Sequence, residues 1–289
     1  MSLQITAFHG LPAVRLALPQ GDTCTIALHG AQVLSWTTSD GVERLYLSPQ
    51  ARFDGHGAIR GGVPICWPQF NARGALTKHG FARNLPWELV VDMSPPSEVA
   101  VEAVAGARCA VLRLRDDEAA RRVWPHAFSL HLTVALAPQQ LRITLSVDNT
   151  GLAPLSFAAA LHSYLRVDDI AQARLEGLQG ANRWDAVRQE HRVETAEALR
   201  FDAEFDSVYA SPAPPLRLVQ PSGTLQISQS ATATETVVWN PGAALCAQLA
   251  DMPDDGYRHM LCVEAARIDD NVLLAPGAQW HSWQALSVL

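Results

Sequence analysis

The alternation of hydrophobic and polar residues is clearest between residues 128 and 147. From 128 to 136 every second residue is a large apolar one, and the same period resumes from 141 to 147. A period of two is that of a β-strand, whose successive side chains point to opposite faces of a sheet. The turn residues Pro138, Gln139 and Gln140 join the two runs. The pattern therefore predicts an antiparallel hairpin with one buried face.

Shorter strand-like runs separated by turn signals cover most of the remaining chain, as is typical of all-β proteins. Strands are expected at residues 13–18, 23–28, 31–37, 44–47, 87–91, 99–104, 110–114, 155–167, 216–219, 225–229, 236–239, 257–265 and 279–286. Residues 116–122 have acids early and arginines late, which favours a short helix. No linker or internal repeat divides the sequence. We therefore predict one all-β domain over residues 1–289, a large antiparallel β-sandwich.

One stretch, residues 59–87, has neither a helical nor a strand period. It combines Trp67 and Trp87 with three prolines, three arginines and the pair Lys78-His79. A segment of this length without regular structure is usually either disordered or functional. This one is too aromatic and apolar for disorder. We interpret it as a shaped loop that places cationic and aromatic side chains over a pocket.

Composition, net charge and cysteine spacing exclude several classes of protein. Of the 289 residues 48% are hydrophobic, which predicts a sizeable core, and the net charge of −7 argues against a nucleic-acid partner. No signal peptide is visible, and no apolar run approaches the about 18 residues of a membrane helix. The five cysteines are scattered and form no C-x-x-C pair, which favours reduced thiols over disulfides or a metal site. We expect a soluble, cytoplasmic protein, monomeric by default.

Familiar catalytic motifs such as the G-x-S-x-G elbow, the H-E-x-x-H helix and the P-loop do not occur in the chain. What remains is a set of ionisable residues placed by the pattern near strand ends. They are His79, His162, Asp206 and Glu264, accompanied by Arg60 and Arg83. A histidine and a carboxylate facing each other across a small pocket suit proton transfer without a cofactor or metal.

A series of motifs then gives a specific resemblance. IRGGVPICWPQF, KHGFARNLPW, LHSYL, DSVY, VWNPG, ADMPDDGY and CVEAA follow one another between residues 59 and 266. In this order they resemble the hexose-6-phosphate mutarotase (glucose-6-phosphate 1-epimerase) branch of the aldose 1-epimerase superfamily. The resemblance implies a galactose mutarotase-like supersandwich that interconverts the α and β anomers of hexose 6-phosphates, glucose 6-phosphate above all.

The resemblance also implies roles for individual residues. Glu264 matches the base that takes the proton from the anomeric hydroxyl, and His162 matches the acid that protonates the ring oxygen. Arg60 and Arg83 match phosphate-binding positions, which suits the paired donors of a guanidinium. Positions lining the sugar are matched by His79 and Asp206. Lys78 could either add to the phosphate site or be solvated.

Other interpretations remain open at this point. From the residues alone, His162 could be a satisfied core histidine, and His79 a packing group of its loop. Asp206 could bind backbone amides at a turn, and the two arginines could tie loops together. Trp67, Trp87 and Trp239 are expected to be core or loop anchors outside the site. The competing functions are a mutarotase for unphosphorylated aldoses and a carbohydrate-binding β-sandwich without catalysis.

Overall fold

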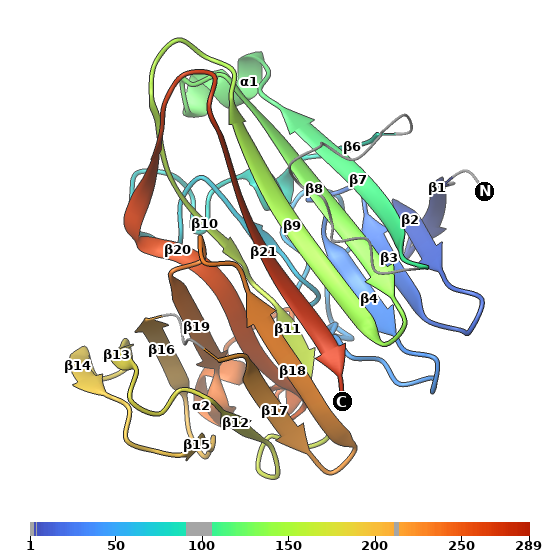
Figure 1. Ribbon diagram of the computed structural model, residues 1–289, viewed down its shortest axis with the longest axis vertical. Helices are drawn as coiled ribbons and strands as arrows, with labels where there is room; N and C mark the ends of the chain where they lie inside the picture. Colours follow the sequence, from blue (N-terminus) through green and yellow to red (C-terminus); the bar gives the residue numbers. More distant parts are fainter. Residues whose placement is uncertain (1–2, 4, 91–105, 211–213) are drawn as a thin grey trace.

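The computed structural model describes residues 3, 5–90, 106–210 and 214–289 of the chain. Nearly all regular structure there is β, arranged in three antiparallel sheets (Figure 1). The smallest is a meander with the order β1 (Ile5–Phe8), β2 (Leu11–Ala17), β3 (Thr23–Ala27) and β4 (Val33–Thr37). The strands predicted for this part of the chain are confirmed, except the one at residues 44–47.

The nine-stranded sheet contains the long hairpin that dominates the hydrophobic pattern. Its order is β15 (Ala198–Leu199), β12 (Arg174–Glu176), β17 (Leu216–Gln220), β18 (Gly223–Gln229), β21 (Gln279–Val288), β9 (Gln140–Asn149), β8 (Phe128–Ala137), β7 (Arg108–Arg115) and β6 (Glu88–Leu89). Figure 1 shows β8, β9 and β21 as neighbouring strands that run diagonally across the view.

The eight-stranded sheet carries most of the polar motifs. Its order is β14 (Glu190–Val193), β13 (Asn182–Asp185), β16 (Phe205–Ala210), β19 (Glu235–Asn240), β20 (Met260–Leu274), β10 (Leu155–Leu161) and β5 (Ile65–Cys66), with β11 (Tyr164–Arg166) also paired to β20. One hydrophobic cluster joins Leu132 and Leu145 of the nine-stranded sheet with Phe157 and Val263 of this sheet, and with Ile26 of the small one. The sheets thus pack through their apolar faces, and the prediction of an all-β antiparallel sandwich is confirmed.

The central hairpin differs from the prediction in one respect. Strands β8 and β9 pair in continuous register, but Thr133 and Thr144, on the face expected to meet solvent, are only 4% and 2% exposed. Longer neighbours shield them, since Trp283 lies opposite Thr144 on β21 and the Arg142 guanidinium stacks on the Trp283 ring at 4.0 Å. The second face of this hairpin is therefore also buried, because large neighbouring side chains cover its small polar residues.

The strand predicted at residues 44–47 is wrong. Leu45 forms an isolated bridge with Leu165, whereas Leu47 forms one with Gly61. Because neighbouring residues bond to different partners, no continuous ladder develops. The strand predicted at residues 99–104 lies outside the described residues. The strand predicted at 110–114 falls within β7.

The predicted helix is confirmed as α1 (Glu118–Val123), with the Asp117 carboxylate capping the Ala120 N–H. A second short helix, α2 (Gly242–Cys246), and two 3₁₀ turns, η1 (Ala82–Asn84) and η2 (Gly256–His259), had no periodic signal. With six residues α1 is the longest described helix, so the described chain holds no helix able to span a membrane.

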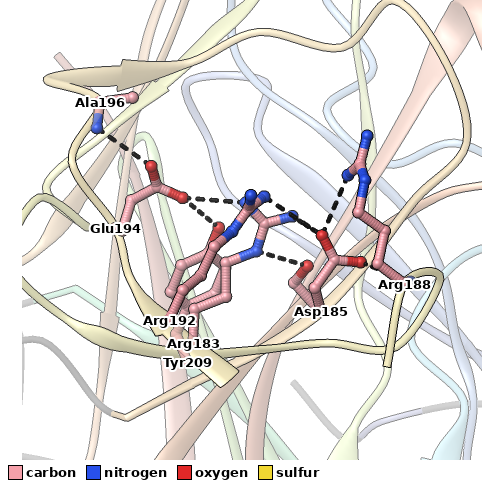
Figure 2. A network of polar contacts seen from close by, with 8 residues as sticks. Arg183, Asp185, Arg188, Arg192, Glu194, Ala196 and Tyr209 are labelled. Atoms are coloured by element: carbon pink, nitrogen blue, oxygen red, sulfur yellow. Dashed lines mark hydrogen bonds and ion pairs between the residues drawn. The ribbon is translucent and has the colours of Figure 1, made fainter. Parts of the chain in front are cut away.

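A buried ionic network joins β13, β14 and β16 at one end of the eight-stranded sheet. Figure 2 shows the Arg183 guanidinium between two carboxylates, 3.0 Å from Asp185 Oδ2 and 3.1 Å from Glu194 Oε2. Tyr209 donates a hydrogen bond to the same Glu194 oxygen, and Arg183 donates to the Ser207 hydroxyl. Each charge is therefore buried with a bonded partner, which offsets its desolvation.

We expect Arg183→Met to lower the free energy of unfolding by about 3 kcal/mol, because Glu194 then has no ion-pair partner among the described residues. Asp185 keeps its ion pairs with Arg188 and Arg192, which limits the loss. Urea unfolding followed by circular dichroism measures the change. The control is Arg174→Met, which removes a solvent-accessible ion pair with Glu176 and should cost at most about 1 kcal/mol. Equal losses in the two variants would contradict this account of the network.

Candidate active site

A polar pocket of about 270 Å³ opens beside the eight-stranded sheet. Every site residue predicted from the sequence lines it, namely Arg60, Lys78, His79, Arg83, His162, Asp206 and Glu264. The other lining residues are Phe70, Asn71, Tyr164, Glu204, Val237, Trp239, Leu245 and Leu249. Residues from five separate parts of the chain thus converge on one cavity.

Strand pairing explains how His162 meets Glu264. Leu161 pairs with Ala265 and Tyr164 with Cys262, so the same register places His162 opposite Glu264. Side chains at opposed positions of antiparallel strands point to the same face and touch. Glu264 lies well inside β20, where it also pairs with Val237 of β19. Glu264 was expected near the end of a strand predicted at residues 257–265. This expectation is wrong, because β20 continues to Leu274.

His162 and Glu264 form a close pair with unused hydrogen-bonding capacity. His162 Nε2 lies 3.3 Å from Glu264 Oε1, and the glutamate side chain is 1% exposed. Glu264 Oε2 and His162 Nδ1 are buried without a hydrogen-bond partner among the described residues. Buried polar atoms are rarely left unpaired, and exceptions cluster where a ligand or chemistry supplies the partner.

Burial controls the protonation of this pair. It lowers the pKa of His162 well below its usual value, with His79 and Arg83 adding to the effect. It raises the pKa of Glu264 well above its usual value, with Asp206 adding and Arg83 opposing. Both shifts disfavour the charged forms, so the two groups titrate as a coupled pair in which the neutral forms are favoured.

His79 is a neutral hydrogen-bond donor on the wall of the pocket. Its Nδ1 accepts the Asn71 N–H at 3.3 Å and the Cys66 thiol at 3.1 Å, which leaves the proton on Nε2. Burial, with Arg83 and Lys78, lowers the pKa of His79 to about 3. Its ring lies 5.5 Å from that of His162, edge to face. The side chain therefore packs within its loop and also borders the site.

The cations of the pocket differ in how they are neutralised. Arg60 binds Asp251 Oδ1 through Nε and Nη2, and donates to the Tyr164 hydroxyl through Nη1. Arg83 donates to the Lys78 carbonyl, and its buried Nε has no partner. Among the described residues no carboxylate forms an ion pair with Arg83 or Lys78. This part of the pocket therefore has positive charge available for an anion.

Gly62 holds the loop of Arg60 close to the small sheet. It has a φ of +60°, and a Cβ there would lie 2.1 Å from the Val33 carbonyl oxygen. Only glycine permits both the left-handed backbone and this approach. The motif glycines thus fix where Arg60 enters the pocket.

Asp206 and Glu204 supply acceptors to the pocket. Asp206 lies near the start of β16, and burial, with Glu204 adding, raises its pKa. Its carboxylate forms no hydrogen bond within the described chain, so the alternative of a turn-capping aspartate gains no support there. An acceptor of this kind suits a hydroxyl-rich ligand.

Sequence reasoning missed several lining residues. Trp239 was expected to be an anchor outside the site, yet it lines the pocket because β19 pairs it directly with Asp206. Trp67 and Trp87 are buried in the core, as predicted. Tyr164 belongs to the LHSYL motif, and its adjacency to His162 was the available signal. Glu204 offered none, since it lies in an irregular, charged segment.

One cluster in the described chain has the donor types of a metal site, with ligand atoms of His162, Cys262 and Glu264 within 4.8 Å of one another. A metal would need the Cys262 thiolate, but burial raises the pKa of that thiol well above its usual value. Cys262 also does not line the pocket. The donor set therefore suits proton transfer between Glu264 and His162 better than metal binding.

Comparison with known proteins identifies the class. The aldose 1-epimerase family profile matches residues 12–287. A protein of Cenchrus ciliaris named "Putative glucose-6-phosphate 1-epimerase" is 36% identical over 287 residues, covering 97% of this chain and 85% of its own. The crystal structure of a "putative mutarotase" from Salmonella typhimurium superimposes with a TM-score of 0.85 at 31% identity, covering 99% of this chain and 93% of that one.

The fold and these similarities define the protein as an isomerase. The chain belongs to the aldose 1-epimerase family. A galactose mutarotase related enzyme from Lactobacillus acidophilus, only 14% identical, shares the fold with a TM-score of 0.72 over 94% of this chain and 96% of its own. The galactose mutarotase-like architecture expected from the motifs is therefore confirmed.

Proposed function

We propose that the protein interconverts the α and β anomers of hexose 6-phosphates, with D-glucose 6-phosphate as the expected substrate. The observation that carries the proposal is the buried His162–Glu264 pair beside Arg83 and Lys78, two cations without a carboxylate partner in the described chain. The names of relatives that are at least a third identical support the same substrate class.

The proposed reaction removes a proton from the anomeric hydroxyl and adds a proton to the ring oxygen. Glu264 takes the proton of the anomeric hydroxyl while His162 gives a proton to the ring oxygen. The bond from C1 to the ring oxygen breaks and a C1 carbonyl forms. Rotation about C1–C2 and reclosure, with the proton transfers reversed, give the other anomer. Each such group contributes about 10²–10⁴ in rate.

Burial affects both ends of this proton transfer. Ring opening begins with a carboxylate and an imidazolium and ends with both groups neutral. Because burial disfavours the charged form of each group, a proton must first pass from Glu264 to His162, whose Nε2 lies 3.3 Å from Oε1, and the two transfers to and from the substrate then return both groups to their neutral forms. A phosphate beside Arg83 and Arg60 would offset the positive charges that lower the pKa of His162. The substrate would thereby help to load the acid with its proton.

Roles for the remaining predicted residues follow from their chemistry. Arg83, Arg60 and Lys78 are proposed to bind the phosphate, since guanidinium and ammonium groups suit phosphate oxygens. His79 and Asp206 are proposed to bind sugar hydroxyl groups as donor and acceptor. No step of this reaction requires a cofactor.

Specificity for phosphorylated sugars is tested with Arg83→Met. We expect the KM for glucose 6-phosphate to rise by about 10- to 100-fold, because a charge-assisted contact is lost. The value of kcat/KM for free glucose should change by less than about threefold. Both are measured by polarimetry of pure anomers. The matched control, Arg73→Met, removes a cation of the same loop that pairs with Asp269 outside the pocket. Equal losses for both sugars in Arg83→Met would contradict phosphate binding and favour a mutarotase for free aldoses.

A further inference from the structure

Tyr164 connects the two halves of the pocket. It begins β11, two residues after His162, and is 3% exposed. Its phenol ring lies parallel to the His162 imidazole, with a centroid distance of 4.8 Å and an interplanar angle of 14°. The Trp239 ring meets the Tyr164 ring edge-on at 6.1 Å. The imidazole is therefore stacked on an aromatic face that is itself confined.

The other end of Tyr164 reaches the phosphate side. Its hydroxyl oxygen accepts a hydrogen bond of 3.0 Å from Arg60 Nη1. The hydroxyl proton has no acceptor among the described residues, although the side chain lines the pocket. This proton is thus available to a ligand oxygen, alongside the remaining N–H groups of Arg60.

The backbone of Tyr164 is held on both sides. Its N–H donates to the Gly62 carbonyl, and its own carbonyl accepts the Tyr46 N–H, each at 2.9 Å. On β20 it pairs with Cys262, two residues from Glu264. Rigid elements around a side chain keep it in a single orientation. Tyr164 thus occupies a fixed position between the loop of Arg60 and the proton-transfer pair.

We propose that Tyr164 is a positioning residue that sets the plane of the His162 imidazole with its ring and orients the Arg60 guanidinium toward the phosphate with its hydroxyl. This inference rests on the function proposed above. The ring prevents rotation of the imidazole away from Glu264, and its face also favours the protonated form. Together with Asp251, the hydroxyl limits the guanidinium to one orientation. One side chain therefore serves both binding and proton transfer, through separate groups.

The two contributions are separable by two substitutions. Tyr164→Phe keeps the stacked ring, so kcat should stay within about twofold, while the KM for glucose 6-phosphate rises about tenfold through the loss of support for Arg60. Its affinity for inorganic phosphate, measured by calorimetry, should fall by the same factor. Tyr164→Leu removes the ring as well and should lower kcat about 100-fold. A purely structural role of Tyr164 would not raise KM alone in one variant and lower kcat in the other.

A double-mutant cycle tests whether the hydroxyl acts through Arg60. Because Tyr164→Phe and Arg60→Met remove the same contact, the two increases in KM should not multiply when combined. Tyr209→Phe is the matched control. It removes another buried hydroxyl that bonds to a charged group in the same sheet, outside the pocket (Figure 2). This variant should keep the wild-type kcat and KM.

The outcomes distinguish this inference from the proposed function. Absence of anomer exchange in the wild type would refute the proposed function itself. The inference fails instead if wild type and Tyr209→Phe are active, and Tyr164→Phe keeps wild-type KM and phosphate affinity. Multiplying effects in the double-mutant cycle would also overturn it. Tyr164→Phe and the cycle decide the question even if Tyr164→Leu does not fold.

Discussion

Replacement of Glu264 by glutamine is expected to lower kcat for anomer exchange about 10³-fold, because the amide cannot take a proton from the anomeric hydroxyl. The substitution keeps the volume and the hydrogen-bonding shape of a side chain that is almost completely buried. KM for glucose 6-phosphate should change little, since the phosphate-binding groups are untouched. Steady-state polarimetry of pure α anomer measures both constants.

The control for this prediction is a second buried glutamate of the same sheet. Glu235 lies on β19 and accepts the Ile268 N–H, but it does not line the pocket. Glu235→Gln should therefore keep kcat within about twofold of the wild type, since it touches no reacting atom. A Glu264→Gln enzyme that retained more than about a tenth of the wild-type kcat would refute the role of the base.

His162→Gln is expected to reduce kcat about 10²- to 10³-fold and to change the pH profile. In the wild type the pair must hold one proton, so activity falls at low pH when a second proton binds. Burial, with His79, Arg83 and Arg60, lowers the pKa of His162. The acid limb of kcat/KM should therefore lie below the ordinary histidine value of about 6.5. In His162→Gln this limb should disappear or move.

The pH profile is measured between about pH 4 and 9, a range that includes the ordinary pKa values of glutamate and histidine, about 4.3 and 6.5. His131→Gln serves as a control, because His131 pairs with Asp148 on the nine-stranded sheet and does not line the pocket. Its profile should match the wild type. An acid limb that stays in place in His162→Gln would show that another group titrates there.

The fold class was predictable because its signal is local. Alternation of period two along 128–136 and 141–147 favours strands without reference to any distant part of the chain. The second face of that hairpin was not predictable, because the burial of Thr144 depends on Trp283, which is far away in the sequence. Residues 44–47 have strand-like composition, but their partners alternate between two other segments. Local pattern cannot reveal that choice.

The candidate site was also predictable only in part: its motif residues could be identified from the sequence, but their contacts could not. Motifs indicated His162 and Glu264, but their contact depends on the register that β10 and β11 share against β20. Trp239 enters the pocket through its pairing with Asp206, and Asp251 neutralises part of Arg60 across a long sequence separation. These relations are set by tertiary packing, so sequence patterns leave them open.

Magnetisation-exchange NMR between the α and β anomers of glucose 6-phosphate tests the central claim most directly, because it reports interconversion at equilibrium without any coupling enzyme. Wild-type protein is compared with buffer, with Glu264→Gln and with His162→Ala at equal concentrations. The account predicts exchange well above the uncatalysed rate for the wild type, and exchange close to that rate for both variants. Wild-type exchange equal to that in buffer would contradict the account and favour a sugar-binding protein without catalysis.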